Sequence, residues 1–384
     1  MYPKIIDCTL REGQQAAGVY FSRDQRQQII AALGAFGVDE IEIGPAAPDS
    51  EMAQIAADIR TFAPRSRCAV WCRCLERDIR MAVDDGGDAV SISLPVSDLH
   101  LEKRLKKSRA WAIERVALAA DAARSAGRPV SLSLGLEDAS RADAGFVFEI
   151  ALAAERAGFD RVRLADTVGS LTPLATTRVF SELRAATTLS LAIHAHNDFG
   201  MATANSVSAL EAGAEWADAS VLGLGERAGI ARLEELGGYL AIRRGDTEYD
   251  VRLLAPLVEF VARITNTAVS DRHPIVGAKL FHCESGIHLD GLAKSEETYQ
   301  PFAPSILGLK WTSSVGMKAG ESAMRNALSS MDVAFEPACL REVTLRMREF
   351  SRQQRRALTN AEIATIVEDV MRARQTAGGA HGTA

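Results

Sequence analysis

The feature that most constrains the fold is a repeated alternation of short apolar segments with longer amphipathic ones over residues 1–245. The short segments are predicted as strands, at residues 5–7, 40–43, 68–72, 89–94, 130–135, 161–165, 189–194 and 216–222. The segments between them place apolar residues at three- and four-residue spacing, which is typical of helices. Eight strands that each precede a helix predict an α/β fold, the (β/α)₈ TIM barrel. A doubly wound parallel sheet is the alternative.

The alternation stops after Gly245. We therefore expect residues 1–245 to form the barrel and residues 246–375 to form a smaller C-terminal helical region. That region has too little apolar periodicity to fold alone, so we expect it to pack on another barrel or on a second subunit. Residues 376–384, which are rich in Gly and Ala, are predicted to be a disordered tail.

Composition narrows the class of protein. The chain has 44 Lys and Arg against 50 Asp and Glu, a net charge of −6 without a basic stripe, which argues against a nucleic-acid partner. No apolar run reaches the roughly 18 residues that a membrane span needs, and the N-terminus starts directly in structure. We therefore expect a cytoplasmic protein without a membrane partner. The six cysteines, including Cys68, Cys72 and Cys74 on one side of a strand, are interpreted as buried reduced thiols.

Two histidines at the end of the seventh strand point to metal chemistry. His194 and His196 are two residues apart on an extended segment, so both imidazoles face the same way and can reach one cation. Barrels place their chemistry where strands end, and Glu12, after the first strand, is the carboxylate that such a site needs. One carboxylate and two histidines leave coordination positions open for substrate oxygens. The alternative is a pair of polar residues that satisfy hydrogen bonds at the rim of the sheet.

Six motifs carry a resemblance to a known family: D-x-T-L-R-E-G-x-Q from Asp7, E-D-A-S-R-x-D from Glu137, A-D-T-V-G from Ala165, H-A-H-N-D-x-G from His194, G-L-G-E-R-A-G from Gly223 and G-I-H-x-D-G from Gly286. Over residues 3 to about 330 the chain resembles the metal-dependent barrel acyltransferases that make 2-isopropylmalate, citramalate and homocitrate. The stretch Ser93-Leu94-Pro95-Val96-Ser97-Asp98, with Trp111 downstream, is most similar to the homocitrate synthases associated with nitrogenase.

The resemblance implies a homodimer that joins acetyl-CoA, 2-oxoglutarate and water to give homocitrate and CoA. It implies a divalent cation, Mg²⁺ or Mn²⁺ with Zn²⁺ or Co²⁺ as alternatives, on Glu12, His194 and His196. The positions that match catalytic residues of the family are Arg11, Glu137, His288 and Tyr299, the last two supplied by the neighbouring subunit. Gln15 and Thr167 match positions that contact the 2-oxo acid.

The chemistry of the residues agrees with these roles. A cation that chelates the carboxylate and ketone oxygens of a 2-oxo acid polarises the carbonyl. The methyl group of a thioester is a very weak carbon acid, so it needs a positioned base, for which His288 is the candidate. Arg11 can stabilise the ketone oxygen as it becomes an alkoxide, and Glu137 can orient His288 or carry its proton.

Three positions depart from the family pattern. Cys283 stands where a histidine is usual, Ile230 replaces an asparagine after E-R-x-G, and Gly316-Met317-Lys318-Ala319-Gly320 replaces G-K-H-S-G. None of these positions belongs to the expected metal or catalytic residues, so we interpret the departures as changes that adjust the activity. A non-catalytic paralogue that binds metabolites would show the same departures.

The receptor for the distal carboxylate of 2-oxoglutarate is the least defined part of the site. Lysine-pathway homocitrate synthases, which this chain resembles, place an arginine where Ser133 stands here. We expect Arg73, at the end of the third strand, to face the barrel mouth and bind this carboxylate, with Ser93 as a hydroxyl donor; Arg163 is the alternative. The basic run at residues 103–107 is interpreted as a solvated helix face rather than a clamp for the phosphates of coenzyme A.

Overall fold

The computed structural model describes residues 2–48, 51–284, 288, 291–292, 294–331 and 333–379. The chain divides into two compact units, Met1–Gly277 and Ala278–Ala384. The division falls later than the expected boundary at residue 245. The reason is helix α9 (Leu254–Thr265), whose apolar face packs against α1 (Arg23–Phe36) of the barrel and so belongs to the first unit.

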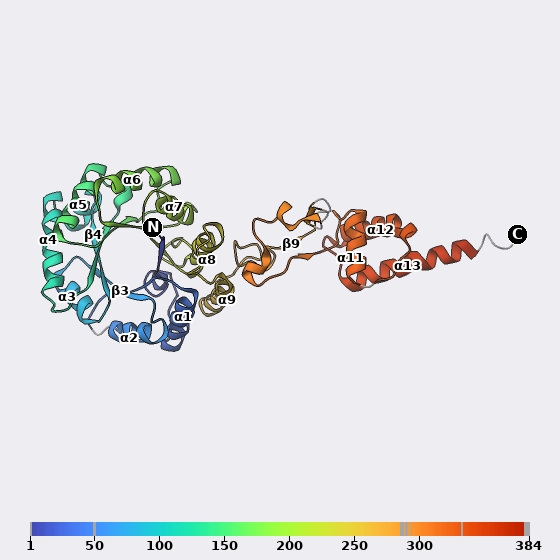
Figure 1. Ribbon diagram of the computed structural model, residues 1–384, viewed down its shortest axis with the longest axis horizontal. Helices are drawn as coiled ribbons and strands as arrows, with labels where there is room; N and C mark the ends of the chain where they lie inside the picture. Colours follow the sequence, from blue (N-terminus) through green and yellow to red (C-terminus); the bar gives the residue numbers. More distant parts are fainter. Residues whose placement is uncertain are drawn as a thin grey trace. The chain divides into compact units, whose positions relative to one another are not determined.

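The first unit is a closed barrel of parallel strands, which confirms the predicted fold (Figure 1). Its strands are β1 (Lys4–Asp7), β2 (Glu40–Ile43), β3 (Arg67–Arg73), β4 (Ala89–Pro95), β5 (Ser131–Glu137), β6 (Arg161–Asp166), β7 (Ser190–Ala195) and β8 (Trp216–Ala219). β1 pairs with both β2 and β8, which closes the ring. β8 is shorter than predicted, because Leu222 turns to a φ of 61° within the 3₁₀ turn that follows it.

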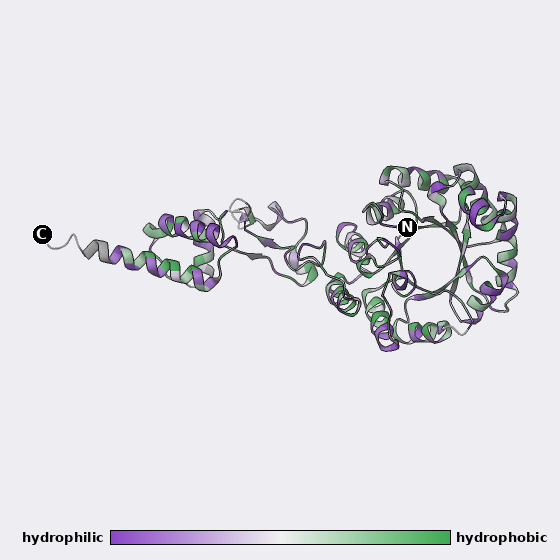
Figure 2. Cartoon of the chain, turned by 180° about the vertical axis from the view of Figure 1, so that it is seen from behind, coloured by the Kyte–Doolittle hydropathy of each residue, from purple (hydrophilic) through white to green (hydrophobic). Residues whose placement is uncertain are grey.

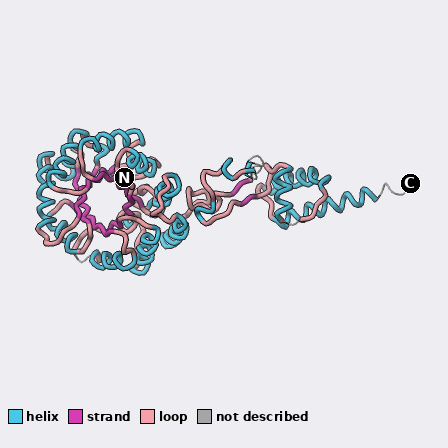
Figure 3. The backbone as a smooth tube through the Cα atoms, viewed as in Figure 1, coloured by secondary structure: helices cyan, strands magenta, loops and turns pink. Residues whose placement is uncertain are grey.

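A ring of helices surrounds the strands (Figure 3). They are α1, α2 (Met52–Phe62), α3 (Glu76–Asp84), α4 (Arg109–Arg124), α5 (Ala144–Ala157), α6 (Pro173–Ala186), α7 (Ala202–Glu211) and α8 (Leu233–Gly238). Their ends follow local sequence signals. Ser22 and Gln25 form a capping box at the start of α1, and Gly37 ends that helix at a φ of 105°, a conformation that other residues rarely adopt.

Charged residues fill much of the barrel interior. Arg161 of β6 reaches across the barrel to Glu40 of β2 and also donates to Ser133 at 3.0 Å. One layer nearer the strand ends, Arg163 donates to Glu42 at 2.6 Å and to Asp218 at 2.9 Å. These side chains are buried, so each charge needs the partner that the opposite strand supplies.

The second unit is a small, mostly helical body with its own core. Its elements are β9 (His282–Cys283), β10 (Thr312–Ser313), α11 (Glu321–Ser330), α12 (Leu340–Gln354) and α13 (Asn360–Gly379), with short 3₁₀ turns between them. Met324, Leu328, Val343 and Met347 are buried together. Each of these helices carries both hydrophobic and hydrophilic residues, as Figure 2 shows.

Helix α13 extends to Gly379, within the expected tail of residues 376–384, and residues 380–384 lie outside the described residues. Disorder of this tail stays a prediction. Among the described residues, no helix is long and apolar enough to cross a membrane.

Candidate active site

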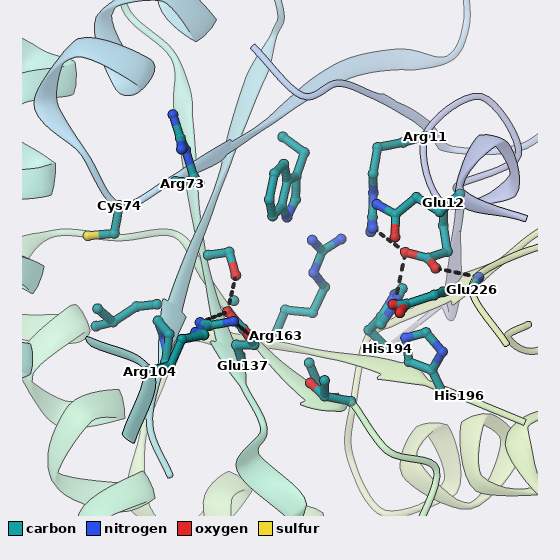
Figure 4. Close-up of a pocket in the computed structure, with 18 of the residues that line it drawn as sticks. Arg11, Glu12, Arg73, Cys74, Arg104, Glu137, Arg163, His194, His196 and Glu226 are labelled. Atoms are coloured by element: carbon teal, nitrogen blue, oxygen red, sulfur yellow. Dashed lines mark hydrogen bonds and ion pairs between the residues drawn. The ribbon is translucent and has the colours of Figure 1, made fainter. Parts of the chain in front are cut away.

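A cavity of about 520 Å³ opens at the carboxyl ends of the barrel strands. It brings together most of the residues that the sequence singled out: Arg11, Glu12, Gln15, Arg73, Ser93, Glu137, Thr167, His194 and His196 all line it. Figure 4 shows Glu12, His194 and His196 on one side and Glu137 with Arg104 on the other, with Arg163 between them. The predicted site residues of the barrel therefore share one cavity.

The two histidines and the carboxylate form a compact cluster. Glu12 follows β1, His194 lies near the end of β7 and His196 follows that strand. One ligand atom of each lies within 4.8 Å of the others. The Oε2 atom of Glu12 is 3.9 Å from Nε2 of His194. All three side chains are buried. The spacing of two residues along the extended chain turns both imidazoles to the same face, as the sequence pattern predicts.

Arg11 holds the carboxylate of this cluster. Its guanidinium contacts Glu12 and donates from Nε to Glu42 at 2.8 Å. Burial alone would raise the pKa of Glu12, but Arg11 and His194 beside it lower that pKa below its ordinary value. Burial would also raise the pKa of Glu42, yet Arg11 and Arg163 hold it well below its usual range. Both carboxylates are therefore ionised at neutral pH.

The residues fit a divalent cation. The Nδ1–H of His194 donates to Asp218 at 2.7 Å, an orientation that turns Nε2 toward Glu12 and is typical of histidines that bind metals. Burial, followed by the nearby His194, lowers the pKa of His196 to about 4, so its ring is neutral at pH 7. Among the described residues, the buried Nδ1 atom of His196 has no hydrogen-bond partner. A neutral imidazole with an unused lone pair is what a cation requires.

The charge balance around the cluster points the same way. Three buried carboxyl groups, those of Glu12, Glu42 and Asp218, lie against the two guanidinium groups of Arg11 and Arg163. A divalent cation would offset this excess of acidic over basic side chains in a buried site.

A glycine-rich loop covers the carboxylate from the side of β8. The backbone N–H of Glu226 donates to Oε1 of Glu12 at 3.0 Å. Gly225 packs against the side chain of Glu12, where a Cβ atom would lie 3.0 Å from Cγ. Arg227 binds Asp198 through two donors, at 2.8 and 2.9 Å, and so ties this loop to the segment after β7. The loop shapes the rim of the cluster.

Glu137 lies across the cavity in an ion pair that the sequence did not reveal. Arg104, in the π-helix η2 (Leu99–Leu105), donates to both of its carboxylate oxygens, at 2.8 and 3.1 Å. Ser93 Oγ lies 3.5 Å from the same carboxylate. The basic run at residues 103–107 therefore is not a solvated face throughout, since Arg104 lines the cavity. The signal was the position of this run, in the segment that joins β4 to α4.

The expected carboxylate receptors differ in their surroundings. Arg73 lines the rim of the cavity, but its Nε atom donates to the buried Asp78 at 2.6 Å and most of its side chain is exposed. Arg163 lies within the barrel interior beneath the cavity. Thr167 also lines the cavity, and its hydroxyl accepts the backbone N–H of Asp138 at 2.9 Å.

The second unit brings its own predicted residues together. The rings of His288 and Tyr299 lie 4.3 Å apart between centroids, and both side chains are exposed. His282, next to Cys283, bonds the hydroxyls of Thr312 and Ser314. His288 and Tyr299 therefore form a pair that is open to solvent in this unit.

The fold and the cluster together define a (β/α)₈-barrel protein with two histidines and one carboxylate at the carboxyl end of its barrel. A family model described as HMGL-like matches residues 2–261, and one described as homocitrate synthase post-HMGL domain-like matches residues 275–355. The chain belongs to the HMGL-like family.

Relatives of known name cover nearly the whole chain. The chain is 34% identical over 368 residues to 2-isopropylmalate synthase 2 of Caldanaerobacter subterraneus subsp. tengcongensis, covering 96% of this chain and 95% of that one. It is 38% identical over 329 residues to a homocitrate synthase of Frankia alni, covering 85% and 92%. The structure of hydroxymethylglutaryl-CoA lyase from Pseudomonas aeruginosa superposes with a TM-score of 0.61 at 22% identity, covering 73% and 97%, which supports the fold.

Proposed function

We propose that the chain is a metal-dependent homocitrate synthase, which condenses acetyl-CoA with 2-oxoglutarate and water to give homocitrate and CoA. One observation carries the choice of substrate: the cavity wall opposite the cluster presents Arg104 and Ser93 around Glu137. A second carboxylate that enters an enclosed cavity needs such partners, because burying it unpaired costs several kcal/mol. On the resemblance of residues 93–98, we assign the homocitrate to the iron-molybdenum cofactor of nitrogenase.

A divalent cation on Glu12, His194 and His196 would supply the Lewis acid that polarises the ketone of the 2-oxo acid. Arg11, fixed by Glu42, stabilises the ketone oxygen as negative charge develops on it. Fixed donors of this kind need no reorganisation during the reaction, so they lower the barrier more than a mobile side chain would.

His288 removes a proton from the methyl group of the thioester, and the resulting carbanion attacks the ketone carbon. Tyr299 lies against His288 and orients its ring. Glu137 orients His288 or receives its proton. Water then hydrolyses the condensed thioester, which releases CoA and makes the reaction irreversible.

In this proposal each site combines the barrel of one subunit with His288 and Tyr299 of its partner in a homodimer. Mixing two inactive variants tests the sharing. Glu12→Ala and His288→Ala should each be inactive alone, and a mixed dimer should regain activity at the one site that has both intact residues. No recovery after subunit exchange, with mixed dimers demonstrated by mass, would place each site within one subunit.

The activity is tested by release of free thiol from acetyl-CoA, with a divalent metal and a panel of 2-oxo acids. We expect 2-oxoglutarate to give the highest kcat/KM. Faster turnover with 2-oxoisovalerate or pyruvate would overturn the assignment in favour of 2-isopropylmalate or citramalate synthesis. The feature that favours those alternatives is the apolar part of the cavity wall, which consists of Trp71, Leu94, Pro95 and Leu105.

A non-catalytic paralogue that binds metabolites is the remaining alternative, which the departures at Cys283, Ile230 and Met317 motivate. Titration of metal into the wild type and into Glu12→Ala distinguishes the enzyme from the non-catalytic paralogue. Wild-type protein that binds metal and 2-oxoglutarate but releases no CoA would favour the paralogue.

A further inference from the structure

The ion pair between Arg104 and Glu137 lies on the surface of the cavity. Two parallel hydrogen bonds join the guanidinium to the carboxylate, at 2.8 and 3.1 Å. The side chain of Arg104 is 49% exposed and that of Glu137 is 23% exposed. Both partners are therefore within reach of a molecule in the cavity.

The other arginines of the cavity have carboxylate partners that are buried. Arg11 binds Glu12 and Glu42, Arg163 binds Glu42 and Asp218, and Arg73 binds Asp78; each of these four carboxylates is at most 3% exposed. Withdrawing any of these cations would take a charge partner away from a buried carboxylate, which is unfavourable. In the part of the chain that the structure describes, Arg104 is the cavity arginine that can exchange its partner at least cost.

The position of Arg104 suits such an exchange. It lies in η2, between β4 and α4, and Lys106 ends that short helix at a φ of 55°. π-helical turns are frequently found at functional sites. The Arg104–Glu137 pair and the Glu12–His194–His196 cluster lie on opposite sides of one cavity (Figure 4). A ligand whose 2-oxo acid end lies at the cluster can therefore extend its far end toward Arg104.

We propose that Arg104 is the receptor for the distal carboxylate of a dicarboxylic 2-oxo acid, and that this carboxylate replaces Glu137 as its partner. The exchange substitutes one bidentate pair for another and frees Glu137 to act on His288. This inference rests on the proposed function and adds the residue that selects the substrate. A 2-oxo acid with an apolar end offers no replacement charge, so Glu137 stays paired and the proton transfer is impaired.

Two variants distinguish this exchange from simple packing, because they shift affinity in opposite directions. Arg104→Ala removes the receptor and should raise the KM for 2-oxoglutarate about 10- to 100-fold, with little effect on the KM for acetyl-CoA. Glu137→Gln removes the competing carboxylate and should tighten binding of 2-oxoglutarate while lowering kcat. Lys103→Ala is the matched control, since it removes an exposed cation of the same helix that does not line the cavity.

Binding is measured directly through the fluorescence of Trp71 and Trp111, which line the cavity, with 2-oxoglutarate and 2-oxoisovalerate as probes. Arg104→Ala should lose affinity for 2-oxoglutarate and keep its affinity for 2-oxoisovalerate. An unchanged affinity, an equal loss for both acids, or a loss confined to Arg73→Ala would overturn the proposal. If wild type binds 2-oxoglutarate without releasing CoA, the proposed function is wrong. The binding measurements on Arg104→Ala still decide the role of Arg104 in that case. Wild type that binds no dicarboxylate overturns both.

Discussion

The Nδ1 atom of His194 lies 2.7 Å from Oδ2 of Asp218, a buried carboxylate that also accepts a hydrogen bond from Arg163. A carboxylate can only accept, so this contact places the proton of His194 on Nδ1 and leaves Nε2 with its lone pair toward Glu12. The orientation of the metal-binding ring is thus fixed by a residue on a neighbouring strand.

We predict that Asp218→Asn lowers the affinity for Mn²⁺ about 10- to 100-fold, because the ring loses the anion that orients it and increases its basicity. Calorimetric titration of Mn²⁺ into metal-free protein measures this effect. Asp78→Asn is the control, since Asp78 is an equally buried carboxylate that pairs with an arginine rather than with a histidine. Equal affinities in Asp218→Asn and wild type would remove Asp218 from the site.

The ion pairs inside the barrel were not predicted from the sequence. Arg163 was considered only as an alternative receptor for the distal carboxylate, yet its side chain lies inside the barrel and pairs with Glu42. The signal was the alternation of charge in two strands, Glu-Ile-Glu-Ile in β2 and Arg-Val-Arg-Leu in β6. Strands buried on both faces are normally apolar throughout, so opposite charges at alternate positions of two strands indicate ion pairs across the interior.

The cluster was predictable because its ligands lie next to strand ends, whose positions follow from local periodicity. The partners of Arg73 and Arg104 were not, since Asp78 lies in α3 and Arg104 in η2, whose placement depends on how the chain folds after β3 and β4. Strand alternation fixes which way a residue inside a strand points. It does not fix the direction of a long side chain in the loop beyond.

We predict that Gly229→Ala weakens metal binding as well as stability. Gly229 has a φ of 79°, and a Cβ atom there would overlap the backbone oxygen of Gly223, so the loop that donates from Glu226 to Glu12 must shift. Gly245→Ala is the matched control, because Gly245 has a φ of 77° and open space around it.

Both substitutions should lower the free energy of unfolding by about 1–2 kcal/mol through the strained φ. Only Gly229→Ala should lose further stability and affinity for Mn²⁺. Denaturant unfolding and metal titration measure the two effects, and identical behaviour of the two variants would show that the loop tolerates the shift.

The pair between His273 and Glu234 makes stability depend on pH. Nε2 of His273 lies 3.2 Å from Oε1 of Glu234, and this buried carboxylate raises the pKa of the histidine. A raised pKa means that the pair stabilises the fold fully below the unfolded pKa of about 6.5, and that this contribution is lost as the pH rises through the higher folded value.

His273→Gln should therefore destabilise the protein more at pH 6 than at pH 9. Urea unfolding of both proteins across this range measures the difference. A gap between His273→Gln and wild type that stays constant with pH would contradict the prediction.

The departure at Ile230 has a packing role that the sequence did not reveal. Ile230 pairs with His196 through a backbone bridge, and its side chain is buried with Ile6, Cys8, Ala192 and Trp216. Restoring the amide usual in the family, Ile230→Asn, would place polar atoms among apolar ones. We predict that it lowers the free energy of unfolding by about 2–4 kcal/mol, because buried amides without partners are costly.

Ile230→Val is the matched control, since it removes one methylene group and should cost about 0.5–1.5 kcal/mol. Denaturant unfolding compares the two variants, and titration with Mn²⁺ reports whether the amide reaches the cluster. The packing interpretation predicts that Ile230→Asn loses stability without binding Mn²⁺ more tightly. A variant that keeps its stability and gains affinity would show instead that the amide joins the metal site, and that Ile230 is the residue that weakens it in this chain.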